Sequence, residues 1–375
     1  MVIEIRQNLI DSIDNQKRVI LGPIMKSRQQ IKEIVLMDKR LIERVEKMAG
    51  RNKNRLKQLK KEATEYFEEI AADYNIHYIL FANRILGWLW KKIFEGIDVD
   101  PEGIAKVREW ARRGTLIYIP SHKSHIDYLI LNCKLHDNHM HIPRIAAGKN
   151  LTFWPLGHIF RQSGAFFIRR SFKFKGAKLY SEVFSRYVKA LLEEGHPIEF
   201  FIEGGRSRNG KLVIPKTGFL SILLQAYNEG FCNDLIFVPT SIIYDRIMEE
   251  KSYLKEINGE SKAKENIWHM MKIRRLLNKK YGKIYIRFNH PFSLNEYLSK
   301  TGRSKDISRG LAFHLIQSMN EVSLVTPLSL IATAILTNHR RGFHASELTD
   351  TFNILLGFLK RNNAPLAPTL RDPLQ

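Results

Sequence analysis

The stretch of sequence that decides the fold reads Thr115-Leu116-Ile117-Tyr118-Ile119-Pro120-Ser121-His122-Lys123-Ser124-His125-Ile126-Asp127. Its first part, 115–119, is apolar and rich in β-branched residues, which predicts a buried strand. Residues 121–135 predict the helix that follows this strand. A polar turn between a strand and a helix is typical of α/β proteins.

The rest of the chain repeats this alternation. We expect strands at 165–168, 198–202, 235–243 and 283–288, with helices at 178–194 and 219–229 between them. The pattern predicts an α/β fold with a mixed, largely parallel sheet flanked by helices. We predict an N-terminal helical region at 1–95, the α/β domain at 96–305 and a C-terminal helical extension at 306–375.

Composition limits the class of protein. The 375 residues are 44% hydrophobic and carry a formal net charge of +22 at pH 7. A sizeable core is therefore expected, and the charge favours an anionic partner: nucleic acid, an acidic membrane surface or a phosphorylated substrate. Cys133 and Cys232 form no CxxC pair, which argues against a zinc site or a disulfide framework.

Two segments come nearest to spanning a membrane, 76–90 and 322–337. The first contains charged residues and the second is short and interrupted by Pro327, so we expect neither to span. The first is typical of an interfacial helix, with Trp88 and Trp90 followed by two lysines, although packing on the next domain is equally open. Residues 1–15 carry acids and no long apolar run, so we expect no signal peptide.

The strand–helix turn carries His122 and Asp127, five positions apart. Within one regular helix they would lie about 140° apart, so they meet only if His122 is in the turn and Asp127 in the first helical turn. An imidazole can take the proton of an attacking alcohol, and a carboxylate can orient the imidazole. A capping histidine and a surface aspartate are the plainer interpretation of this pair alone.

Cationic residues follow two other predicted strands. The run 164–170 ends in Arg169 and Arg170, and the glycine-rich loop after 198–202 carries Arg206, Arg208 and Lys211. Arginine binds phosphate through paired, charge-assisted hydrogen bonds. The alternative for the arginine pair is a strand end in contact with solvent.

These blocks, in this order, resemble the glycerol-3-phosphate acyltransferase family, including its dihydroxyacetone-phosphate branch. The first block is His122-x4-Asp127, with Lys123 where the family usually has arginine. The second is Gly-x-x-Phe-Ile-Arg-Arg at 164–170. The third is Phe-x-x-Glu-Gly-x-x-Ser-Arg at 200–208, and the fourth has Pro239 with Tyr244 downstream. Residues 146–150 and 153–155 resemble the bacterial membrane-bound members, and the likeness covers roughly 55–345.

The resemblance implies a role for each block. His122 would be the general base on the acceptor's 1-hydroxyl, with Asp127 orienting it. The acceptor would be bound by the other block residues: Phe167, Arg169, Arg170, Glu203, Gly204, Arg206, Ser207, Arg208, Lys211 and Pro239. The donor would be acyl-CoA or acyl carrier protein, with no other cofactor, no metal and no covalent acyl-enzyme.

The resemblance also implies a location and partners. We expect the cytoplasmic face of a membrane, the inner membrane of a bacterium, with peripheral or monotopic attachment to an anionic surface and no nucleic acid. Between glycerol 3-phosphate and dihydroxyacetone phosphate, the bacterial-like segment near Trp154 favours glycerol 3-phosphate. A basic protein that binds nucleic acid or a membrane surface is the alternative from another class.

Three other site hypotheses are weaker. The loop 205–211 matches Gly-x4-Gly-Lys, but Leu212 stands where a phosphate loop needs serine or threonine. His136, His139 and His141 with Asp137 could bind a metal, although solvated loop histidines are the better interpretation. Ser121 or Ser124 could act as a nucleophile, but there is no Gly-x-Ser-x-Gly elbow, and Ser121 is better explained as a helix cap.

Overall fold

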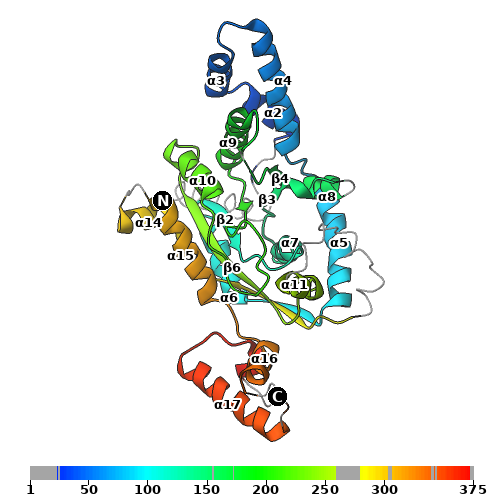
Figure 1. Ribbon diagram of the computed structural model, residues 1–375. Coiled ribbons are helices and arrows are strands. Elements are labelled where there is room, and N and C mark those ends of the chain that lie inside the picture. Colours follow the sequence, from blue (N-terminus) through cyan, green and yellow to red (C-terminus); the bar gives the residue numbers. More distant parts are fainter. Residues whose placement is uncertain are drawn as a thin grey trace, which may run out of the picture.

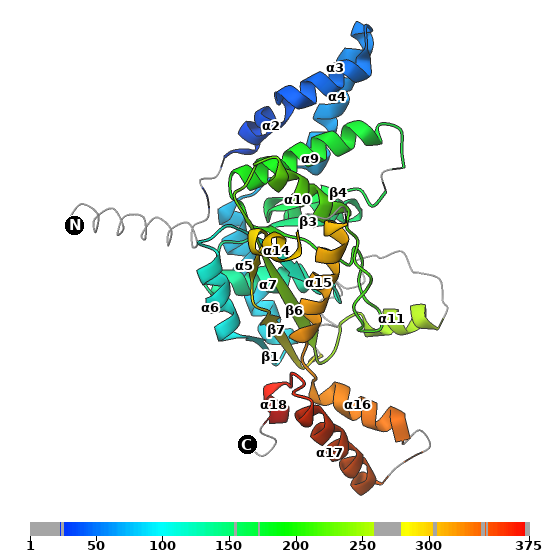
Figure 2. The ribbon, with the colours of Figure 1, turned by 90° about the vertical axis from the view of Figure 1, so that its left-hand side faces the viewer.

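The structure is a computed structural model, and its described part begins at Pro23 (Figures 1 and 2). The described residues are 23, 26–153, 156–171, 173–258, 279–302, 306–338, 342 and 344–371. Trp154 and Pro155, on which the bacterial resemblance partly depends, lie outside this set, as does much of the predicted helical region before residue 26.

The N-terminal part is helical, as the sequence predicts. It contains α2 (Arg28–Leu36), α3 (Lys39–Ala49), α4 (Lys53–Ile70) and α5 (Ile76–Ile93). Side chains of Ser27, Asp38, Asn52 and Asn75 cap the four helix N-termini, because each accepts a backbone N–H that has no partner within its helix. Helices α2 to α4 lie at the top of Figure 1 and contact α9 (Ala177–Glu193).

Eight strands form one sheet in the order β1-β7-β6-β2-β5-β3-β4, with β8 paired to β6. The strands are β1 (Gly96–Val99), β2 (Thr115–Pro120), β3 (Arg144–Gly148), β4 (Ala165–Ile168), β5 (Ile198–Glu199), β6 (Leu235–Tyr244), β7 (Lys283–Phe288) and β8 (Phe292–Ser293). Neighbours pair in parallel except where β6 meets β7 and β8. The prediction of a mixed, largely parallel sheet is confirmed.

Helices cover both faces of the sheet, so both faces are apolar. On one face α9, α10 (Gly218–Asn228) and α15 (Ile307–Glu321) pack with Ile117 and Phe237. On the other face α5, α6 (Pro101–Trp110) and α7 (Asp127–Asp137) pack with Tyr118 and Val238. The remaining described helices are η1 (Lys149–Leu151), α8 (Leu156–Gln162), α11 (Glu250–Ile257), α14 (Leu294–Thr301), α16 (Pro327–Asn338), α17 (Ala345–Arg361) and α18 (Pro368–Arg371).

Two element predictions needed correction. The strand expected at 198–202 contains only two residues, because the chain leaves the ladder before a turn in which Gly204 adopts φ +62°. The helix expected from Ser121 begins instead at Asp127, and its N-cap residue, Ile126, makes no side-chain cap. The six residues before Asp127 are therefore loop, which allows the first sequence block to fold back on itself.

The C-terminal part contains two kinds of helix. Helix α15 packs on β6, and Leu311 and Leu315 belong to the same buried cluster as the sheet. Helices α16 and α17 form a separate pair at the bottom of Figure 1. Within the described ranges, no helix is both long enough and apolar enough to cross a bilayer.

Candidate active site

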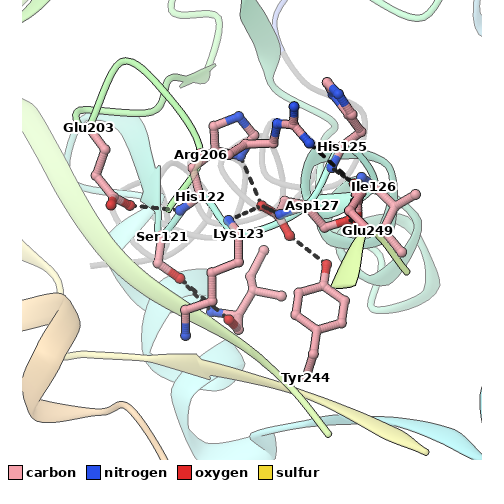
Figure 3. Close-up of polar contacts among 12 residues, drawn as sticks. Ser121, His122, Lys123, His125, Ile126, Asp127, Glu203, Arg206, Tyr244 and Glu249 are labelled. Carbon is pink, nitrogen blue, oxygen red and sulfur yellow. Dashed lines mark hydrogen bonds and ion pairs between the residues drawn. The ribbon is translucent and has the colours of Figure 1, made fainter. Parts of the chain in front are cut away.

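The His122–Asp127 pair forms at the carboxyl end of β2. The Nδ1 atom of His122 lies 2.9 Å from Oδ2 of Asp127, which is fully buried (Figure 3). Oδ2 also accepts the backbone N–H groups of Lys123 (2.7 Å) and Ser124 (2.9 Å), and the Tyr244 hydroxyl donates to Oδ1. A carboxylate on Nδ1 places the ring proton there and leaves Nε2 to accept a proton.

The imidazole is held on a second side by an aromatic ring. Phe201 stacks on His122 with a centroid distance of 3.9 Å and an interplanar angle of 23°. The His122 side chain is still 14% exposed. It is therefore fixed in orientation yet open to solvent, as a base that meets an incoming substrate must be.

The four consecutive backbone N–H groups from His122 to His125 all donate to carboxylates. His122 N donates to Oε1 of Glu203 at 2.7 Å, and His125 N donates to Oε1 of Glu249 at 2.9 Å. The intervening N–H groups of Lys123 and Ser124 donate to Asp127. These four groups are therefore not available to stabilise a developing oxyanion, which needs donors of its own.

The loop after β5 is bound to the first block. Glu203 is 1% exposed, and its second oxygen accepts Val213 N at 2.9 Å; burial raises the pKa of this carboxyl. Ser207 N donates to the His122 carbonyl at 2.8 Å. At Gly204, a Cβ would meet the Lys216 side chain at 2.6 Å. The first and third sequence blocks are therefore one hydrogen-bonded unit.

Three of the predicted phosphate-binding arginines already have carboxylate partners. Arg169 donates from Nε and Nη2 to the two oxygens of Glu69, each at 2.6 Å, and Lys149 contacts the same carboxylate at 2.7 Å. Arg206 and Arg208 are the other two, and their carboxylates come from the chain around α11. Arg206 lies 3.6 Å from Glu249 and Arg208 lies 3.1 Å from Glu256.

Arg170 and Lys211 differ from these three. Both are exposed, and neither forms an ion pair with any residue that the structure describes. Arg170 follows β4, and β4 is three strand spacings from β2 in the sheet order. With a spacing of about 4.8 Å, the two strand ends are about 14 Å apart. The space between His122 and Arg170 lies over the ends of β5 and β3.

Comparisons with known proteins agree with this arrangement. Residues 99–243 match the family model described as Acyltransferase, and residues 253–375 match Glycerol-3-phosphate acyltransferase C-terminal region. A curated glycerol-3-phosphate acyltransferase of Shewanella loihica is 34% identical over 92% of this chain, and one of Ectopseudomonas mendocina is 34% identical over 96%. One from Shewanella baltica is 38% identical over 91%. The chain therefore contains regions that match the acyltransferase domain and the glycerol-3-phosphate acyltransferase C-terminal region, and it is similar to these curated proteins.

The chain spans less than half of those relatives, namely 44%, 45% and 41% of their lengths. Among solved structures, a 1-acyl-sn-glycerophosphate acyltransferase from Thermotoga maritima aligns over 76% of this chain and 87% of its own, with 17% identity and a TM-score of 0.39.

Two residues that the acyltransferase resemblance assigns to the acceptor site lie in the core. Phe167 is fully buried, with the Arg161 guanidinium 4.8 Å from its ring centroid. Pro239 lies within β6, between the residues that pair with β8 and those that pair with β7, where a missing N–H breaks no ladder bond. Their direct contact with substrate remains a prediction.

The hydroxyls of both serines in the first block form hydrogen bonds within the protein. Ser121 Oγ accepts Ile242 N at 3.0 Å, so it joins β2 to β6 and does not cap a helix, contrary to the sequence prediction. Ser124 Oγ donates to Glu249 at 2.9 Å. Both serines are fully buried, which argues against a serine nucleophile at this site.

Of the suggested histidine cluster, His139 is exposed and His136 is half-buried, as expected for solvated histidines, but the third histidine is not. His141 is buried, and its ring stacks near that of His196 with centroids 6.3 Å apart. Within the described ranges, no three histidine, cysteine or acidic side chains form a group that could hold a metal. A cavity of about 490 Å³ lies at the amino ends of β2 and β6, where it is lined by residues such as Arg112, Thr115 and Asp234. It is therefore remote from His122, which follows the carboxyl end of β2.

Several residues of the candidate site were missed by sequence reasoning. Tyr244 was noted only as part of the fourth block, although its place at the end of a strand could have indicated a site residue. Glu249, Tyr253 and Phe201 contact the first block across long sequence separations. Glu69 lies 100 residues from Arg169. A single sequence carries no signal for such pairings.

Proposed function

We propose that this chain transfers a fatty acyl group from acyl-CoA or acyl carrier protein to the sn-1 hydroxyl of glycerol 3-phosphate. The product is lysophosphatidic acid, which opens phospholipid synthesis. The observation that carries the proposal is the His122–Asp127 pair, whose imidazole is oriented and still exposed. The names of the curated relatives support the acceptor.

The chemistry follows from the pair. Nε2 of His122 takes the proton of the acceptor hydroxyl as its oxygen attacks the thioester carbonyl carbon. The buried carboxylate of Asp127 stabilises the imidazolium that forms. The carbon–sulfur bond then breaks, and the thiolate leaves with the proton from His122. No step needs a covalent acyl-enzyme, a metal or a further cofactor.

The phosphate of the acceptor would lie between His122 and the cations. Arg170 and Lys211 have no carboxylate to displace among the described residues, so we assign them the first contacts with the phosphate. Arg169 would join them only if the phosphate displaced Glu69. Arg206 and Arg208 instead form ion pairs that hold the loop after β5 against the chain around α11.

An acylation assay with purified protein tests this function. It offers glycerol 3-phosphate, dihydroxyacetone phosphate and glycerol as acceptors, each with palmitoyl-CoA and with acyl carrier protein carrying the same chain. We expect transfer to glycerol 3-phosphate, and none to glycerol, which lacks the anion. Faster transfer to dihydroxyacetone phosphate would favour the alternative acceptor. No acyl transfer, together with salt-sensitive binding of random DNA, would favour a nucleic-acid-binding protein.

We also propose that the protein works at the cytoplasmic face of a membrane, attached peripherally by α5. Large apolar side chains on this helix are exposed: Ile76, Leu80, Phe81, Ile85 and Trp88. Arg84, Lys91 and Lys92 are exposed on the same helix, which contains no acidic residue. An apolar surface with cations and no acids complements an anionic lipid surface.

Vesicle flotation tests the attachment. The protein should float with phosphatidylglycerol vesicles more than with phosphatidylcholine vesicles. Phe81→Glu with Trp88→Glu should abolish flotation, whereas Ile354→Glu, at an exposed apolar position on α17, should not. Equal loss in both variants would assign the surface to α17 as well as α5, and unchanged flotation of the α5 variant would refute the proposal.

A further inference from the structure

Strand β6 extends past β2 beside the histidine loop. Pro120, the last residue of β2, pairs with Thr240, and β6 continues for four more residues to Tyr244. Ile242 and Tyr244 lie in the buried cluster on the α7 side of the sheet. The final residue of β6 therefore lies against the N-terminus of α7, where Asp127 is.

The Tyr244 hydroxyl completes a chain of three side chains. It donates to Oδ1 of Asp127, whose other oxygen lies 2.9 Å from Nδ1 of His122 (Figure 3). Tyr244 is 8% exposed, and burial next to Asp127 raises its pKa well above the usual value. The phenol thus stays protonated and remains a donor over the pH range in which an imidazole titrates.

We propose that Tyr244 is a positioning residue for the reaction: it holds the Asp127 carboxylate against His122. The inference rests on the proposed function only for its kinetic readout. Without the phenol, Oδ1 loses its side-chain donor in a buried place, and the carboxylate is freer to turn away from Nδ1. The imidazole is then held less firmly in the tautomer whose Nε2 accepts a proton.

Other titratable or charged groups face this triad from several elements. They are Lys123, Tyr128, Glu199, Glu203, Arg206, Glu249 and Tyr253. All of them remain in a Tyr244→Phe protein. The matched control is Tyr118→Phe, because Tyr118 lies in the same buried cluster and its hydroxyl has no hydrogen-bond partner in the described part of the chain.

Steady-state kinetics is the first test. Tyr244→Phe should lower kcat by about 10- to 100-fold, as expected for loss of a hydrogen bond to a charged group, and leave KM for glycerol 3-phosphate nearly unchanged. Tyr118→Phe should resemble the wild type in both quantities. In an Asp127→Ala background, Tyr244→Phe should cause no further loss.

A second readout needs no turnover. Proton–nitrogen NMR of the labelled His122 ring should show the Nδ1 proton less far downfield in Tyr244→Phe than in wild type and Tyr118→Phe, because its hydrogen bond to Asp127 is held less firmly. If the phenylalanine variant does not fold, 3-fluorotyrosine at position 244 keeps the ring and changes the donor strength of the hydroxyl, so the same proton signal should shift. An unmoved Nδ1 proton signal in the variant that folds overturns the inference, whether or not the wild type transfers acyl groups. Absent acyl transfer in the wild type would instead overturn the proposed function.

Discussion

The histidine loop after β2 and the arginines after β4 both lie at the carboxyl ends of the parallel strands, but they are held in different ways. In the loop, Asp127, Glu203 and Glu249 engage every backbone N–H from His122 to His125. After β4, one arginine is bound to Glu69 and the next is exposed. The His122 imidazole is therefore oriented in the free protein, whereas the arginines that we propose to bind phosphate are held less completely.

Replacing Asp127 tests the histidine loop, which the carboxylates hold, and should have the largest effect. Asp127→Asn keeps the size of the side chain but presents an amide to Nδ1 of His122, which disfavours the tautomer with a free Nε2. We expect kcat to fall by about 10²- to 10⁴-fold with little change in KM. Single-turnover acyl transfer measures this, and an Asn variant with wild-type kcat would show that the contact has no catalytic role.

Replacing Arg170 tests the arginines after β4. Arg170→Ala should raise KM for glycerol 3-phosphate by about 10- to 100-fold, because a charge-assisted hydrogen bond to phosphate is lost, while kcat changes less. Arg112→Ala, at an exposed arginine beside the remote cavity, is the matched control and should leave KM unchanged. Equal KM values in all three proteins would place the phosphate elsewhere.

Glu69 decides whether Arg169 is available to substrate. If phosphate displaces this carboxylate, Glu69→Gln should lower KM for glycerol 3-phosphate by about three- to tenfold, because the competing ion pair is weakened. Initial rates at varied acceptor concentration distinguish the cases. A raised KM would mean that Glu69 positions Arg169 and that no displacement occurs.

Glu199 lies in β5, where it pairs with Tyr118 of β2, the strand that precedes the histidine loop. Its replacement should give the smallest effect. Glu199 is fully buried, accepts a hydrogen bond from Asn132 of α7 at 3.2 Å, and burial raises its pKa well above the usual value. A carboxyl with a raised folded pKa supports the fold below its unfolded pKa and loses that support as pH rises towards the folded value.

Glu199→Gln removes this titration and nearly preserves the shape. The variant should therefore melt several degrees above wild type at pH 8 and at the same temperature as wild type at pH 4, with acyl transfer retained. Thermal unfolding followed by circular dichroism measures both values. A lower Tm at pH 8 would show that Glu199 is ionised and paired in the folded protein.

Part of the sheet and part of the candidate site were predictable from sequence. The apolar run before Pro120 predicts β2, whereas the contact of His122 with Asp127 was expected from the family resemblance, because the pair alone favoured a capping histidine and a surface aspartate. The short strands β1, β3 and β8 were not predicted, because none of them has a continuous apolar run like that of β4. Strand β5 was predicted too long, because the apolar residues 200–202 continue the run after the chain has left the sheet.

The partners of the cations could not be predicted. Arg169 and Arg208 are charged residues in family motifs, and their motifs give no indication that Glu69 and Glu256 already bind them. Such pairings depend on how α4 and α11 pack beside the sheet. Phe167 and Pro239 likewise belong to sequence blocks but lie in the core.

The most direct test of the central claim is the rate of acyl transfer to glycerol 3-phosphate by His122→Ala protein, measured beside the wild type at saturating acyl-CoA. Loss of a general base should reduce kcat by at least about 100-fold, with thermal stability and vesicle flotation unchanged. A folded His122→Ala protein that transfers acyl groups at the wild-type rate would contradict the account.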